Sequence, residues 1–254
     1  LCVLCGKLSS GFFKEVKAMI DIHSHILPGV DDGARTLDEA LDMLRMAVDG
    51  GVTIQVLTPH IHYGRYENQK ADLEKRFAIF QDQVDTANIK IGLQLGSEVR
   101  IGSEIMQLVA QDAIPTLGEY NGKKTFLLEF PRIDVPVGYE NLVKWLINKN
   151  YLPIIVHPER NQTFVRLPQK LQVLTDMGCP LQITASSLTG LFGEEAQQNA
   201  EKLLEEGRVS AIASDCHNLK GRKPNLIEGV AAAELLIGQA QASSLVYSVP
   251  NQLV

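Results

Sequence analysis

Histidine and acidic residues recur along this chain in a pattern that could bind metal ions. Two H-x-H pairs stand near its start, and further histidines and acids follow at intervals. The candidate ligands are His23, His25, Asp32, His60, Glu98, Glu129, His157, Asp215 and His217. Imidazole and carboxylate ligands without thiolate pairs suit Mn²⁺, Fe²⁺ or Zn²⁺ better than Mg²⁺ or Ca²⁺. One ion needs only three or four ligands, so nine candidates predict two or three ions with bridging carboxylates.

The individual signals differ in strength. His23 and His25 end a strand-like run, where residues two apart point to the same side, so both imidazoles can bind one cation. In the second pair, His60 and His62, we expect one histidine to be a ligand and the other to face either the ligands or the substrate, and His60 is counted among the nine candidates. Asp32 lies in a loop rich in proline and glycine, where acids are often only solvated, so ligation and solvation both stay open for it.

The elements that must position these residues are short apolar runs, each followed by a helix-like stretch. Such alternation predicts parallel βα units, in either a doubly wound sheet or a barrel. All six histidines and three of the acids fall at the carboxyl end of a run or within about five residues after it, and these ends share one face of such folds. The strand-like runs are Met19–His23, Val52–Leu57, Ile89–Leu95, Thr125–Glu129, Leu152–Val156, Leu181–Thr184 and Val209–Ala213.

Two of the candidates follow runs of residues typical of a protein core. Glu129 ends TFLLE and His157 ends LPIIVH, and a carboxylate is costly to bury without a cation or a hydrogen-bond donor. Helix signals lie between the runs: Thr36 and Glu39 have the spacing of a capping box, and apolar residues recur along one face over 73–84. The segment Gln111–Lys124 is interpreted as an extra loop or small hairpin.

Length and composition limit the class of protein. The chain has 254 residues, a net charge of −6 and 45% hydrophobic residues. It has no apolar run of about 18 residues, which excludes an integral membrane protein, and no basic block to bind nucleic acid. We expect a single domain over 19–254, in the cytoplasm. Residues 1–18 lack the apolar stretch of a signal peptide and are interpreted as a vector-derived or upstream-translated leader, with Met19 as the natural start.

The four cysteines are too sparse for a disulfide framework. Cys2 and Cys5 form a CxxC pair, but no second pair completes a zinc site. Cys216 and Arg222 have the C-x5-R spacing of cysteine-dependent phosphatases. The segment contains only one glycine, and the neighbouring Asp215 would raise the thiol pKa where such a nucleophile needs it lowered. We therefore expect Cys216 to be a packing residue.

Charge points to the class of substrate. Four carboxylates and three divalent cations would give the site a charge of about +2, which favours an anion such as a phosphate ester. Arg160 lies three residues after His157, and Arg222 lies five residues after His217. Arginine binds phosphate oxygens with two donors, so both are candidate substrate contacts, although either could instead form a surface ion pair.

Six motifs together resemble one branch of the PHP (polymerase and histidinol phosphatase) superfamily. They are DIHSHILPGVDDGA, TPH, GSE, LLE, VHPER and SDCHN-x3-R-x-P, in this order from Met19 onward. This branch comprises the manganese-dependent bacterial protein-tyrosine phosphatases that regulate capsule and exopolysaccharide synthesis. The resemblance implies a distorted (β/α)7 TIM-like barrel with three metal ions. The implied ligand groups are His23, His25, Glu98 and Asp215; Glu98, Glu129 and His157; and Asp32, His60 and His217.

The resemblance also implies the reaction. A hydroxide bridging two metals would attack phosphorus in line, with Arg160 and Arg222 on the phosphate. The phenol that leaves has a pKa of about 10, so a general acid is dispensable, and His62 is the candidate if one acts. The implied substrate is the tyrosine-rich tail of a membrane-associated bacterial tyrosine kinase. The alternatives are histidinol phosphatase, a nuclease and a phosphotyrosine-binding module without turnover. A nuclease should have a basic groove, and a non-catalytic module should lack Glu98 and Glu129.

Overall fold

The computed structural model describes residues 19–254, so the leader and the Cys2–Cys5 pair lie outside the described residues. Ten strands and eleven α-helices are described, together with the 3-10 helix η1 (Pro158–Arg160). The strands are β1 (Met19–Asp21), β2 (Val52–Leu57), β3 (His60–Ile61), β4 (Gly92–Leu95), β5 (Glu98–Arg100), β6 (Gly118–Tyr120), β7 (Lys123–Glu129), β8 (Tyr151–Val156), β9 (Leu181–Thr184) and β10 (Ala211–Ala213). The helices are α1 (Leu37–Asp49), α2 (Lys70–Thr86), α3 (Ile105–Ala110), α4 (Tyr139–Asn148), α5 (Gln162–Arg166), α6 (Pro168–Asp176), α7 (Ala185–Leu188), α8 (Glu194–Glu205), α9 (Leu226–Ile237), α10 (Gln239–Ser244) and α11 (Pro250–Leu253).

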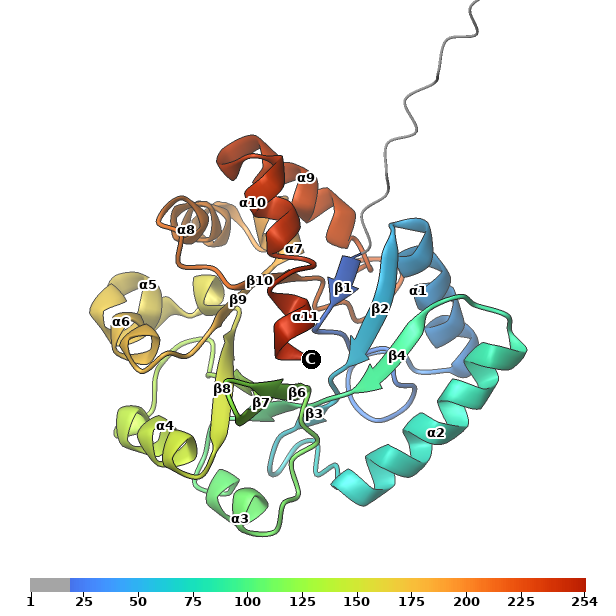
Figure 1. Ribbon diagram of the computed structural model, residues 1–254, viewed down its shortest axis with the longest axis horizontal. Helices are drawn as coiled ribbons and strands as arrows, with labels where there is room; N and C mark the ends of the chain where they lie inside the picture. Colours follow the sequence, from blue (N-terminus) through green and yellow to red (C-terminus); the bar gives the residue numbers. More distant parts are fainter. Residues whose placement is uncertain (1–18) are drawn as a thin grey trace, which may run out of the picture.

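The strands form parallel sheets with helices around the outside (Figure 1). One sheet has the order β1-β2-β4, and the other runs β10-β9-β8-β7-β5-β3, with β6 added antiparallel to β7. The chain passes from β2 directly into β3 and from β4 directly into β5, so the two sheets share continuous segments. After β1 and β10, a parallel bridge joins Ser24 to Cys216. The predicted α/β fold with parallel strands is confirmed.

The predicted strands agree with the observed ones to within a few residues. Two have the predicted bounds, β2 and β9. The third strand begins at Gly92 rather than Ile89, because Ile89 still belongs to the turn that ends α2. Its N–H donates a hydrogen bond to Val84 O, and the preceding Asn88 has a left-handed φ of 55°. The short strands β3 and β5 were not predicted, since two or three residues are too few to show an alternating pattern.

The helix and hairpin signals correspond to observed structure. Thr36 caps α1, and its Oγ1 accepts a hydrogen bond from Glu39 N at 3.2 Å. The apolar face over 73–84 lies on α2, where it packs into the core. The segment Gln111–Lys124 contains a hairpin between β6 and β7, turned by Asn121 and Gly122, whose φ angles are 51° and 71°. Such positive φ angles suit the two central residues of a tight hairpin turn.

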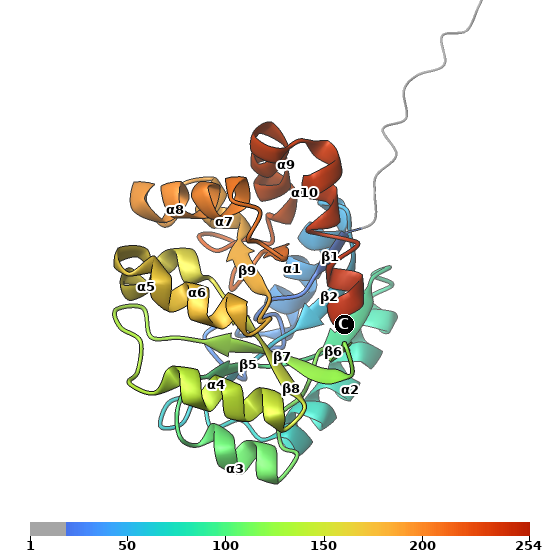
Figure 2. The same ribbon diagram turned by 60° about the vertical axis from the view of Figure 1, so that its left-hand side comes forward.

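The core has two parts. The larger lies between the strands and the surrounding helices. The smaller lies between the strands themselves and is made of Ile20, Ile22, Val56, Leu117, Leu127, Ile154, Val156, Ala211, Ala213 and Leu253. Leu253 belongs to α11, which lies among the strands in the view of Figure 1 and contacts β6 and β1; Figure 2 shows the same helix from another side. Thr125 Oγ1 donates to Leu253 O at 2.7 Å, so this short helix is anchored to β7.

None of the helices within residues 19–254 is long and apolar enough to cross a membrane.

Candidate metal centre

The structure brings all nine candidate ligands together beyond the carboxyl ends of the strands. Their donor atoms form four overlapping groups in which all atoms lie within 4.8 Å of one another. The groups are His25, Asp32, His60 and His217; His23, His157 and Asp215; His23, His25 and Glu98; and His60, Glu98 and Glu129. Because His23, His25, His60 and Glu98 each belong to two groups, the groups form one continuous cluster.

The most deeply buried part of the cluster contains four donors. The Nε2 atoms of His23 and His25 lie 3.3 Å apart. Glu98 Oε2 lies 3.3 Å from the first and 3.2 Å from the second. Asp215 Oδ1 lies 3.4 Å and 3.5 Å from the same two nitrogens. Two nitrogens and two oxygens therefore face one small volume, which is the set of donors that the resemblance assigns to one metal.

Both of these histidines are oriented through their second nitrogen. Gln182 Oε1 lies 2.8 Å from Nδ1 of His23, and Asp31 Oδ2 lies 2.8 Å from Nδ1 of His25. Asp31 also accepts hydrogen bonds from the backbone N–H groups of Gly33 and His60. A partner at Nδ1 directs Nε2 toward a metal. Burial lowers the pKa of His25, but the carboxylates of Asp31, Asp215 and Glu98 together outweigh it, so the pKa is raised overall.

His60 lies between two parts of the cluster. Its Nδ1 is 3.0 Å from Glu98 Oε2 and 4.0 Å from Glu129 Oε2. Its Nε2 is 3.4 Å from Asp32 Oδ1, which also lies 3.6 Å from His217 Nε2. Asp32, His60 and His217 thus come together as the resemblance implies, although His60 contacts the carboxylates of the second implied group as well.

His157 is placed differently from the implied grouping. It groups here with His23 and Asp215, while Glu129 groups with His60. The link to the second group is Glu98, whose Oε1 lies 2.9 Å from His157 Nε2 while its Oε2 faces the other histidines. His157 and Asp215 also have left-handed backbones, with φ of 39° and 51°. Residues other than glycine seldom adopt this backbone conformation, and where they do, they occur preferentially at functional sites.

Three buried donor atoms and the protonation states of Glu98 and His157 fit divalent cations. Glu98 Oε2, Glu129 Oε2 and His60 Nδ1 make no hydrogen bond, and their nearest ionic partners are one another and Arg100. Burial opposes ionisation of Glu98, but His60, His23 and His157 together outweigh it and hold the carboxyl pKa well below its usual value. Burial, with Arg160, lowers the pKa of His157 to about 3. Metals bind carboxylates and neutral imidazoles, so Glu98 and His157 are already in the binding form at neutral pH.

Two arginines converge on Oδ2 of Asp215, whereas its Oδ1 faces His23 and His25. Its Oδ2 lies 2.6 Å from Nη2 of Arg160 and 2.5 Å from Nη2 of Arg222. Burial opposes ionisation of Asp215, but its neighbouring cationic and hydrogen-bonding groups, with Arg222 first among them, together hold its pKa well below the usual value. Phe192 covers this arginine pair: its ring centre lies 4.4 Å from Cζ of Arg160 and 5.9 Å from Cζ of Arg222. The Asp215 carboxylate therefore connects the histidine cluster, through Oδ1, to both guanidinium groups, through Oδ2.

A cavity of about 680 Å³ opens over the cluster. Both predicted arginines line it, and so do groups that the sequence analysis did not single out: Arg65, Tyr66, Arg100, Arg132 and Phe192. Like the histidines and acids, these residues lie at or beyond the ends of strands. They were not predicted from the sequence because arginines and aromatic residues are common in loops whether or not they serve a site. A cavity with several arginines suits an anionic ligand.

His62 and Cys216 have contrasting positions. His62 lines the cavity but belongs to none of the four donor groups described above. Burial, with Arg100, lowers its pKa. Cys216 is fully buried in the core and is not among the residues that line the cavity. Burial, with Asp21, raises its thiol pKa to about 12, so the sulfur is neither exposed nor ionised at neutral pH. Cys216 is a packing residue, as predicted.

The family follows from comparison with known proteins. A family model described as capsular polysaccharide synthesis, CpsB/CapC, matches residues 19–254. The chain belongs to the CpsB/CapC family. The resemblance to the capsule-regulating phosphatase branch, expected from the motifs, is thereby confirmed.

Several relatives of this CpsB/CapC chain carry a functional name. It is 36% identical over 220 residues to tyrosine-protein phosphatase YwqE of Bacillus subtilis, covering 87% of this chain and 85% of the relative. It is 31% identical over 235 residues to tyrosine-protein phosphatase CpsB of Streptococcus agalactiae, covering 89% and 94%. The chain also matches a solved structure with a TM-score of 0.86 and 34% identity, covering 92% of this chain and 94% of that one. That structure is described as belonging to a study of YwqE from B. subtilis and CpsB from Streptococcus pneumoniae, unique metal-dependent tyrosine phosphatases.

Proposed function

We propose that this chain is a metal-dependent tyrosine-protein phosphatase of capsule or exopolysaccharide synthesis. One observation carries the proposal: nine imidazole and carboxylate donors converge beside an arginine pair that shares Asp215. Metal ligands and arginines side by side match the needs of phosphoryl transfer, in which negative charge must be held and oriented. Relatives that are at least 31% identical and named tyrosine-protein phosphatases support the choice of substrate.

The fold that we propose is a distorted (β/α)7 barrel in a single domain over 19–254. Joining β2 to β3 and β4 to β5 gives seven successive parallel segments. Closure between the first and last is supported by the Ser24–Cys216 bridge and by two backbone hydrogen bonds of 2.9 Å, from His25 N to Cys216 O and from Asp215 N to His23 O. The apolar cluster between the strands is what the interior of such a barrel would contain.

We propose three ion sites that share the nine donors. His23, His25, Glu98 and Asp215 would hold one ion, Asp32, His60 and His217 another, and Glu98, Glu129 and His157 a third, with Mn²⁺ as the proposed ion and Fe²⁺ or Zn²⁺ as alternatives. Glu98 would bridge, because its two oxygens face different histidines. When bound, divalent cations supply Lewis acidity toward water and toward phosphoryl oxygens.

The chain's own residues bind and orient the phosphate. Arg160 and Arg222 line the cavity, and the Asp215 carboxylate holds both guanidinium groups in place. They neutralise the phosphoryl oxygens in the ground state and as charge redistributes in the transition state. The leaving phenol has a pKa of about 10 and needs little protonation. His62, on the cavity wall, is the group that we place nearest the leaving phenol.

The physiological substrate that we propose is a phosphorylated bacterial tyrosine kinase, dephosphorylated on its tyrosine-rich tail in the cytoplasm. The open cavity and the exposed loops around it are compatible with a polypeptide substrate. The two cysteines of the described chain, Cys179 and Cys216, are both free and buried, as is usual for a protein of a reducing compartment.

One experiment tests the proposed function. Purified protein is assayed on a phosphotyrosine peptide with its metal content measured in parallel, before and after chelation and before and after thiol alkylation. We expect chelation to abolish hydrolysis, added Mn²⁺ to restore it, and alkylation to leave it largely intact. Full activity after removal of all metal would overturn the proposal.

A further inference from the structure

A second cavity, of about 800 Å³, adjoins the candidate metal centre. It lies between the first turn of α2 and α3, and the residues His62, Tyr66 and Arg100 line both cavities. None of its lining residues in the described part of the chain is a candidate metal ligand. Each cavity by itself has the volume of a complete small-ligand site, so together they exceed what one phosphotyrosine side chain needs.

A short turn over residues 62–66 separates the two cavities. His62 N–H donates to Tyr66 O at 2.9 Å, and Tyr66 N–H donates to His62 O at 2.7 Å. Gly64, with φ of 77°, allows the reversal between them. The Tyr66 ring stacks on His60, with centroids 5.4 Å apart and planes 7° from parallel. The wall of the second cavity is therefore in direct contact with the metal centre and is held in place by hydrogen bonds.

The floor of the second cavity is apolar. Ile61, Val99, Ile101 and Ile105 line it, and all four are buried in the protein core. Tyr63, at the tip of the turn, also lines it and is 72% exposed. Apolar side chains of an occupant would therefore find apolar contacts along the floor and an aromatic ring at the edge.

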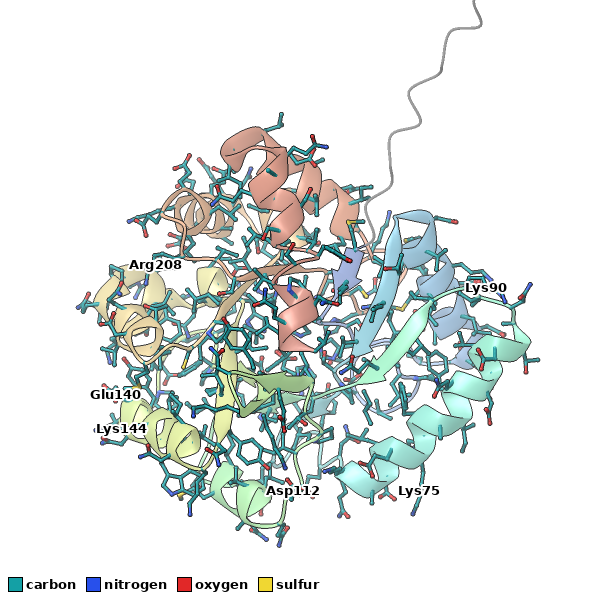
Figure 3. The ribbon with its side chains drawn as sticks, in the orientation of Figure 1. Lys75, Lys90, Asp112, Glu140, Lys144 and Arg208 are labelled. Carbon is teal, nitrogen blue, oxygen red and sulfur yellow. The ribbon has the colours of Figure 1, made fainter. Side chains whose placement is uncertain are left out.

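The rim of the cavity is acidic. Its two cationic residues are already paired: Lys70 with Asp112 at 3.7 Å, and Arg100 with Glu129 at 3.1 Å. The Lys70–Asp112 pair closes the far end, and Figure 3 labels Asp112 between α3 and the start of α2. The exposed carboxylates that remain on the lining are Glu67, Glu74 and Glu104. The charge of this rim favours an occupant with basic side chains.

We infer that the second cavity binds the polypeptide next to the phosphorylated tyrosine and selects a segment with apolar and basic side chains. The inference rests on the proposed function, because the phosphotyrosine must occupy the first cavity. Extended chain advances about 3.3 Å per residue, so residues within a few positions of the phosphotyrosine reach the second cavity. The two cavities share the wall formed by His62, Tyr66 and Arg100, so a peptide that crosses this wall passes directly from one cavity to the other.

The test compares phosphotyrosine peptides that carry either two lysines or two glutamates within five positions of the tyrosine, on its amino or its carboxyl side. The protein is metal-loaded, and phenyl phosphate serves as a substrate without flanking residues. The variant Glu74→Lys/Glu104→Lys reverses the rim charge. Asp176→Lys/Glu205→Lys is the matched control, because these exposed acids lie on α6 and α8 and line neither cavity.

We expect wild-type kcat/KM to favour the lysine peptide on one side of the tyrosine by about three- to tenfold, the size of one or two exposed charge pairs. Rim reversal should abolish or invert this preference, and the control should retain it. The preference should also shrink at high salt. If the reversed variant does not fold, Glu74→Gln/Glu104→Gln should lose the preference instead. Hydrolysis of both peptides without preference, or a preference unchanged by the rim variants, overturns the inference. A wild-type protein that hydrolyses neither peptides nor phenyl phosphate overturns the proposed function itself.

Discussion

Replacing Arg160 with alanine removes one of the two guanidinium groups that contact Asp215. The lost interaction is a charge-assisted hydrogen bond of 2.6 Å in a largely buried position. Such bonds contribute roughly 1.5–3 kcal/mol when the partner carries a charge. If Arg160 makes an equivalent bond to the phosphoryl group, this range converts to a fall in kcat/KM of about 10- to 150-fold. Arg222 still pairs with Asp215 in the variant, so the carboxylate remains ionised.

The assay measures kcat/KM on a phosphotyrosine peptide together with metal content per chain and the melting temperature. Metal content should stay at the wild-type value, because the atom of Asp215 that faces the histidines is Oδ1, whereas Arg160 contacts Oδ2. Arg160→Lys should recover only part of the activity, since lysine cannot form the bidentate contact. Arg166→Ala, an exposed arginine on α5, is the matched control. If Arg160→Ala keeps kcat/KM within twofold of wild type with full metal, Arg160 does not bind the phosphate.

Three further predictions concern separate parts of the molecule. Glu98→Gln should lose at least one metal ion per chain and more than about 100-fold in activity, measured by elemental analysis and kinetics; unchanged metal content would remove it from the ligand set. Cys216→Ala should hydrolyse phosphotyrosine within about threefold of wild type, and the native thiol should resist alkylation at pH 8 because it is buried with a pKa of about 12; rapid labelling would contradict this. Hydrogen bonds from Lys124 and Tyr151 lower the pKa of Asp112 to about 2, below its unfolded value, so this carboxylate stabilises the fold above about pH 4 and loses that effect as pH falls toward 2. Asp112→Asn should therefore lower the melting temperature by a few degrees at most at pH 7 and by less at pH 3, and an equal shift at both would argue against it.

The donor residues could be predicted from the sequence because their positions obey a simple rule. Glu129 and His157 each end a run of apolar residues, and in parallel folds such ends meet on one face. Periodicity could not decide between an open sheet and a closed barrel, since the same βα alternation produces both. Nor could the sequence pattern predict the role of Gln182. This polar residue lies within β9, and its side chain orients His23, which follows β1. Phe192 was missed because its contact with the arginine pair depends on how two loops meet.

The placement of α11 has a consequence for how the molecule is made. Ile20 N–H donates to Val246 O, and Leu253 fills the space between strands that are translated long before it. During synthesis, the apolar lining of that space stays open to water until the ribosome has passed residue 253. We therefore expect these contacts to form late in folding and folding to be slow, because they join segments that are distant along the polypeptide. Removal of α11 would leave the first strands of the chain without the apolar contacts that Leu253 makes.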